Sequence, residues 1–147
     1  MNSKIIWIAS YPKSGNTWIR YLISNYFFNL EKKFKFEIAK KIKNFPTEDE
    51  MKSIVDESKI LKDPYKIADY WIKAQEKLRI KSTEVNNKNN SKMNVVFLKT
   101  HNALVSINKK AFTNEVYSLA AIHIVRDPRD IVVSYSNFAG VDYDEII

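Results

Sequence analysis

The chain has 147 residues, of which 45% are hydrophobic, and this size and apolar content suit one folded domain with its own core. It has no cysteine, which excludes a disulfide-stapled fold, and no apolar stretch long enough for a membrane span or a secretory signal, so we expect a cytoplasmic protein. The formal net charge of +7, from 24 basic and 17 acidic residues, suits an anionic ligand; because the lysines are interspersed with acidic residues, no nucleic-acid partner is predicted.

The first predicted element is a buried strand over Lys4 to Ser10, followed by a tight turn and a helix from Asn16. The helix has apolar residues at helical spacing: Trp18, Ile19, Leu22, Ile23, Tyr26 and Phe27. Successive backbone N–H groups in such a turn, together with the positive end of the helix, favour phosphate or sulfate. Lys13 adds a full charge, and Gly15, one of only two glycines, permits the backbone conformations of the turn. An ordinary strand-to-helix turn is the alternative.

Two helices are predicted in the middle of the chain. One begins near Pro46 and runs to about Ser58, and the other begins at Asp63 and Pro64. The second helix has an apolar side made of Ile67, Tyr70, Trp71, Ala74 and Leu78, so we expect these helices to cover a sheet. The polar, asparagine-rich segment from Thr83 to Asn94 is predicted to be a loop.

The next predicted strand, Val95 to Thr100, carries Lys99 and His101 at its end. In open α/β sheets the carboxyl ends of the strands are where ligands bind. A neutral histidine in such a place can accept a proton from an alcohol. A single histidine is more often structural, and His123, inside the apolar run Ala120 to Val125, is expected to be of that kind.

A third buried strand is predicted over Leu119 to Val125, with a helix after it. Asp127 can cap this helix, and Pro128 occupies a favoured first position. The apolar face of the helix comprises Ile131, Val132, Tyr135 and Phe138. Gly140 is a natural stop.

Arg126 and Ser134 stand at the end of this strand and about two turns into the helix. A fork of guanidinium donors and a hydroxyl at these places could converge on one anion. The alternative is that Arg126 forms a surface ion pair with Asp127 or Asp130, while Ser134 is an ordinary residue of a helix face.

The sequence from Tyr11 to Trp18, YPKSGNTW, resembles without a gap the 5′-phosphosulfate-binding loop of sulfotransferases that use 3′-phosphoadenosine 5′-phosphosulfate (PAPS). The segment VRDPRDIVVSY is similar to the family's 3′-phosphate motif, in which an Arg and a Ser stand eight positions apart, as Arg126 and Ser134 do. The string LKTH resembles the segment that carries the family's general base. The nucleotide-kinase pattern GxxxxGK[ST] is absent, because Lys13 precedes Gly15.

The resemblance implies a three-layer α/β/α fold with a parallel sheet, similar to P-loop NTPases, in a single domain over residues 1–147. Members of this family continue into further strands and a glycine-rich segment that grips the 3′-phosphate and adenine. We therefore expect this chain to be a partial domain, truncated at the C-terminus. A sheet cut short would expose an edge, which favours a homodimer.

The resemblance also implies a reaction, the transfer of the sulfuryl group of PAPS to an acceptor hydroxyl or amine, without a metal. The implied catalytic residues are His101 as general base, Lys13 at the leaving phosphosulfate oxygen and Lys99 at the sulfuryl group. The implied donor-binding residues are Lys13, Ser14, Gly15, Asn16 and Thr17 at the 5′-phosphate, Trp18 at the adenine, and Arg126 and Ser134 at the 3′-phosphate. A role for Trp18 in the core is the alternative, and Ser134 is expected to hydrogen-bond Lys13 before substrate binds.

Two other functions stay open at this point. One is a catalytically inactive remnant that binds a nucleotide or a partner chain. The other is a P-loop phosphotransferase, which needs a Mg²⁺-holding aspartate after an apolar strand, a place that Asp127 roughly occupies. The sequence does not predict whether the acceptor is a small molecule, a glycan or a lipid.

Overall fold

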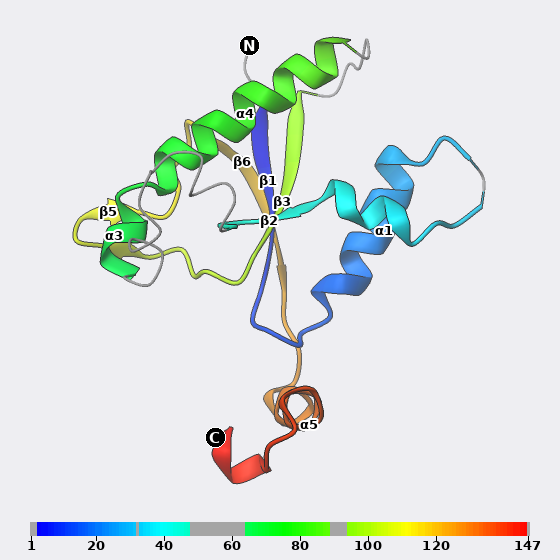
Figure 1. Cartoon of the computed structure of the whole chain (residues 1–147), viewed down its shortest axis with the longest axis vertical. Coiled ribbons are helices and arrows are strands. Elements are labelled where there is room, and N and C mark those ends of the chain that lie inside the picture. Colours follow the sequence, from blue (N-terminus) through cyan, green and yellow to red (C-terminus); the bar gives the residue numbers. More distant parts are fainter. Residues whose placement is uncertain (1–2, 32, 48–63, 89–93, 147) are drawn as a thin grey trace.

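A four-stranded parallel sheet forms the centre of the chain in a computed structural model, which describes residues 3–31, 33–47, 64–88 and 94–146 (Figure 1). The strands of the sheet stand in the order β2-β3-β1-β6, and β4 and β5 form a separate antiparallel ribbon. The strands are β1 (Lys4–Ser10), β2 (Lys43–Asn44), β3 (Val95–Thr100), β4 (Ser106–Ile107), β5 (Lys110–Ala111) and β6 (Ser118–Ile124). The helices are α1 (Asn16–Phe28), α3 (Pro64–Ala68), α4 (Trp71–Lys88) and α5 (Pro128–Ala139), with the 3-10 helices η1 (Glu37–Lys41) and η3 (Tyr143–Glu145).

Strand β1 lies between β3 and β6 and pairs with both in parallel; Ile6, for example, stands opposite Phe97 on one side and Ala120 on the other. An uninterrupted apolar run is typical of a strand that has neighbours on both sides and helices over both faces. The strands predicted over residues 4–10 and 95–100 are confirmed with the same bounds. The third predicted strand begins and ends one residue earlier than expected, at residues 118–124.

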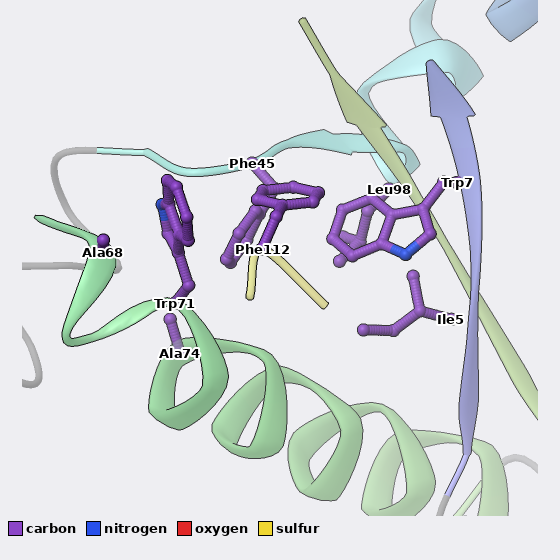
Figure 2. Packing of buried hydrophobic residues seen from close by; sticks show 8 residues of the cluster. All are labelled: Ile5, Trp7, Phe45, Ala68, Trp71, Ala74, Leu98 and Phe112. Atoms are coloured by element: carbon purple, nitrogen blue, oxygen red, sulfur yellow. The ribbon is translucent and has the colours of Figure 1, made fainter. Parts of the chain in front are cut away.

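Successive side chains of β1 point to opposite faces of the sheet, so this one strand contributes to two cores. The larger core packs β1 and β3 against α3, α4 and the segment after β5 (Figure 2), through Ile5, Trp7, Phe45, Ala68, Trp71, Ala74, Leu98 and Phe112. The smaller core, Ile8, Ile42 and Phe97, packs against Ile19, Ile23 and Phe28 of α1. Helices α1 and α4 thus cover opposite faces, and the predicted three-layer α/β fold is confirmed (Figure 1).

The middle of the chain differs from the prediction in two places. The helix expected from Pro64 is broken at Asp69 and Tyr70 into α3 and α4, although its apolar side packs into the core as expected. Helix α4 then continues to Lys88, through residues predicted to be a loop. A hydrogen bond from the Ser3 N–H to Thr83 Oγ1 (2.7 Å) anchors this extension to the start of the sheet, a long-range contact that local sequence does not reveal. The helix predicted to run to Ser58 lies outside the described residues beyond residue 47.

Strand β6 and helix α5 are much less buried than predicted. Within the described sheet β6 is an edge strand, and Leu119 is 57% exposed. His123 is exposed as well, so it does not pack into a core as a residue of a buried strand would. Helix α5 lies beyond the carboxyl ends of the strands (Figure 1), no residue of it is buried, and Phe138 is 73% exposed. An apolar pattern shows which residues can be buried, but not what covers them.

Two buried tryptophans offer a matched test of hydrogen bonding in the larger core. Trp7 Nε1 donates to Ser118 Oγ at 2.7 Å, whereas the buried Trp71 Nε1 has no acceptor among the described residues. Both Trp→Phe changes remove similar volume, but Trp71→Phe also removes an unsatisfied donor. We expect Trp7→Phe to lower the free energy of unfolding by about 1–2 kcal/mol more than Trp71→Phe, measured by urea denaturation. Equal losses, or a larger loss for Trp71→Phe, would contradict this assignment.

Candidate functional site

The turn between β1 and α1 has the special backbone that the sequence predicts. Gly15 has a φ of 99°, in the left-handed region that glycine enters without steric cost. Lys13 also has a positive φ, 64°, which is uncommon for a residue with a side chain and was not predicted. Such conformations cluster at ligand-binding turns, where the surrounding structure maintains them.

The turn and the first residues of α1 form a cradle of donors. Gly15 is the N-cap of α1 and supplies no side-chain cap, and the first turn contains no acidic residue. Ser14 is buried, and its Oγ has no hydrogen-bond partner among the described residues. Unpaired N–H groups at a helix N-terminus and a buried hydroxyl without a partner fit an oxyanion ligand.

Arg126 and the start of α5 meet this turn from the other side. Arg126 Nη1 donates to the carbonyl oxygen of Lys13 at 3.1 Å. Arg126 Nε also lies 3.6 Å from a carboxylate oxygen of Asp130, so the ion pair considered as an alternative is present too. The structure therefore brings Lys13 and Arg126 together, as a shared binding site requires.

Lys13 is also in contact with α5. Its Nζ lies 4.3 Å from the ring centroid of Phe138, a cation–π contact. Ser134 stands one turn before Phe138 and therefore on the same side of α5. The hydrogen bond expected between Ser134 and Lys13 is not among those of the described residues; the lysine contacts the aromatic ring instead.

His101 follows β3 and lies against the last residue of β1. Its Nδ1 is 2.7 Å from the carbonyl oxygen of Ser10 and 3.4 Å from Ser10 Oγ. Ser10 immediately precedes the anion-binding turn, so the histidine lies at the edge of the sheet where that turn begins. The structure thus places the predicted base beside the predicted anion loop.

Lys99 is half-buried on β3, and Arg20 of α1 lies near it. Burial lowers the pKa of Lys99, and the charge of Arg20 lowers it further. Arg20 Nη2 donates to the carbonyl oxygens of Ala39 (3.3 Å) and Ile42 (3.1 Å), which holds the segment between η1 and β2 against α1. Sequence analysis missed Arg20; the signal was a polar residue at every fourth position of α1, namely Asn16, Arg20 and Ser24.

Trp18 does not belong to the core. It is 67% exposed and meets only the edge of Tyr21 among the ring contacts of the described residues, with 6.3 Å between their ring centroids. The core role considered for Trp18 is therefore wrong, and its indole faces solvent directly after Thr17, the last residue of the predicted anion loop.

Two pockets flank the strand ends. One, of about 320 Å³, is lined by Ala9, Thr100 and Asn102 together with apolar residues that include Leu104 and Leu119. The other, of about 500 Å³, lies between Tyr11 and the C-terminal segment of the chain, including Ile131, Val132, Tyr135 and Ile146. Both pockets have largely apolar linings.

These features define an α/β protein with a turn rich in hydrogen-bond donors after its central strand β1, a histidine after β3 and an arginine after β6. The family model described as sulfotransferase domain matches residues 3–143, so the chain belongs to the sulfotransferase family. The predicted family is confirmed. No curated protein matches the chain significantly. In the part of the chain that the structure describes, no helix is long and apolar enough to cross a membrane.

Because the folded state disfavours the charged form of Lys99, its lowered pKa is a cost to stability. This cost is present at neutral pH and disappears only as the pH rises through the lowered pKa toward 10.5, the ordinary pKa of a lysine. We expect Lys99→Met to raise the unfolding temperature by about 1–3 °C at pH 7.5, with the gain shrinking at alkaline pH, by thermal denaturation. The exposed Lys81 provides the control, since Lys81→Met should change little. A lower unfolding temperature for Lys99→Met than for Lys81→Met would refute the argument.

Proposed function

We propose that the chain transfers the sulfuryl group of PAPS to a hydroxyl or amine of a small-molecule acceptor. The observation that carries the proposal is the convergence of three groups at one edge of the sheet. The turn containing Lys13 follows β1, His101 follows β3 and bonds the residue that precedes the turn, and Arg126 follows β6 and bonds the Lys13 carbonyl.

The donor would lie along the first turn of α1. The turn from Ser14 to Thr17 would hold the 5′-phosphosulfate. The backbone N–H groups of Gly15 to Thr17 and the Ser14 hydroxyl suit this ligand, because they have no acceptor among the described residues, whereas the Ser14 N–H donates to the Tyr11 carbonyl oxygen at 3.3 Å. Arg126 and Ser134 would bind the 3′-phosphate. The ion pair of Arg126 with Asp130 is exposed and therefore weak, so the guanidinium could leave Asp130 and bind the phosphate instead. The exposed indole of Trp18 is available to stack on the adenine.

In the reaction we propose, His101 accepts the proton of the acceptor hydroxyl, and the acceptor oxygen attacks sulfur in line. A new S–O bond forms while the bond from sulfur to the 5′-phosphate oxygen breaks, and 3′-phosphoadenosine 5′-phosphate (PAP) leaves. Lys13 stabilises the negative charge that grows on the bridging oxygen, giving up its contact with Phe138, which is worth only about 0.5–2 kcal/mol. Lys99 would contact the sulfuryl oxygens.

A phosphotransferase reaction is less well supported. Asp127, the residue that would hold Mg²⁺, caps α5 by accepting from the Arg129 N–H at 2.9 Å and also binds the Arg129 side chain at 3.0 and 2.6 Å. These hydrogen bonds lower the pKa of Asp127 and use its oxygens. The carboxylate thus has a structural role at the helix N-terminus.

Calorimetric titration with PAP at one fixed salt concentration tests the donor site. We expect micromolar binding that weakens at least about tenfold, roughly 1.4 kcal/mol, in Arg126→Ala or when the ligand lacks the 3′-phosphate. Arg129→Ala is the matched control, because Arg129 lies in the same segment but its side chain is 90% exposed and pairs with Asp127. Equal binding of ATP and PAP would favour the phosphotransferase, and absence of PAP binding by the folded chain would refute the proposal.

Turnover of PAPS with an acceptor panel tests the base and the loop lysine. His101→Ala should reduce kcat by about 10²–10⁴ while PAP still binds, because only proton transfer is lost. Lys13→Ala should weaken both turnover and binding. His123→Ala is the control, since the other histidine is exposed on β6 and has no part in the mechanism. Full turnover in His101→Ala would exclude the proposed base.

A further inference from the structure

The contact between His101 and Ser10 fixes which ring nitrogen carries the hydrogen. A backbone carbonyl oxygen can only accept a hydrogen bond, and His101 Nδ1 lies 2.7 Å from the carbonyl oxygen of Ser10. Nδ1 must therefore carry a hydrogen. Because a neutral imidazole has only one N–H, its Nε2 has the free lone pair and is the nitrogen that can accept a proton.

The residue that bonds the histidine is itself held by Asn16. Asn16 Nδ2 donates to Ser10 Oγ and to the carbonyl oxygen of Ile8, both at 3.1 Å. The carbonyl partner fixes the orientation of the amide, because only the nitrogen can donate to it. Ser10 and Asn16 are 5% and 6% exposed, so water does not compete freely for these bonds.

We propose that Asn16 is a positioning residue for His101, acting through Ser10 to keep the neutral ring in the form with hydrogen on Nδ1 and the lone pair on Nε2. The inference deepens the proposed function, on which it rests, by giving the Asn16 side chain a part in proton transfer. Asn16 was predicted only to hold the 5′-phosphate. Its backbone begins α1 in the anion cradle, while its side chain is turned toward β1 and the base. One residue therefore links the cradle to the base.

A merely structural role, tying α1 to β1, is the alternative. The Asn16 amide is not optimal for that purpose, since its Oδ1 is buried without a partner among the described residues. Leaving such an acceptor unpaired costs about 1–3 kcal/mol. Asn25 provides the matched control, because it lies on the same helix and its Nδ2 ties α1 to another segment through the carbonyl oxygen of Lys35 at 2.9 Å.

The tautomer of His101 is measured by two-bond ¹⁵N–¹H correlation spectra of the imidazole rings. The chain has only two histidines, and the His123→Gln variant assigns the signals. We expect neutral His101 in the Nδ1–H form in the native chain and in Asn25→Ala, and a mixture with the Nε2–H form in Asn16→Ala. Ser10→Ala, which keeps the carbonyl but loses Oγ, should give a smaller shift in the same direction and serves if Asn16→Ala does not fold.

The kinetic expectation is a fall in kcat of about tenfold or more in Asn16→Ala, with the acidic limb of the pH profile displaced and the apparent KM for PAPS changed much less. An Nε2–H tautomer in the native chain would overturn the proposal. So would an unchanged tautomer in Asn16→Ala and Ser10→Ala, with kcat no lower than in Asn25→Ala. The spectra do not require turnover, so a chain that fails to transfer sulfate but keeps the Nδ1–H form would refute the proposed function and not the positioning by Asn16.

Discussion

The parallel pairing of β1 with β3 and β6 is the constraint on which the site depends. Parallel strands have their carboxyl ends at the same edge of a sheet, so the segments after all three strands must meet there. This pairing brings together Lys13, His101 and Arg126, which are far apart in the sequence. The hydrogen bonds from His101 to the Ser10 carbonyl and from Arg126 to the Lys13 carbonyl join these segments through the backbone of β1 and its turn.

Several residues at this edge lower the stability of the folded protein. Lys13 has a left-handed backbone conformation, Ser14 Oγ is buried without a partner among the described residues, and Lys99 is half-buried near the charge of Arg20. Each feature is unfavourable in the protein alone. The oxyanion of the proposed donor would accept from the Ser14 hydroxyl and favour the charged form of Lys99. The cores on the two faces of the sheet supply the stability that maintains this arrangement.

The proposed link through Asn16 gives the anion loop a second effect. The backbone of Asn16 belongs to the predicted anion loop, and its side chain is linked to His101 through Ser10. One set of hydrogen bonds would then both order the loop and orient the histidine. Groups that are held in place before the substrate binds need not move during the reaction.

The sequence by itself determined the two central strands, the loop between β1 and α1 and the family, because continuous apolar runs, helical spacing and a dense local motif are written within a few residues of one another. It also determined the cap and stop of α5, where Asp127 accepts from the Arg129 N–H and Gly140 has a φ of 70°. Only the tertiary structure decided that β6 is an exposed edge, that Trp18 faces solvent and that Thr83 anchors an extended α4. It also decided that Asn16 bonds Ser10, the residue that contacts His101, and that Arg20 lies near Lys99. These outcomes depend on contacts between segments distant in the chain, and local patterns do not encode which segment covers another.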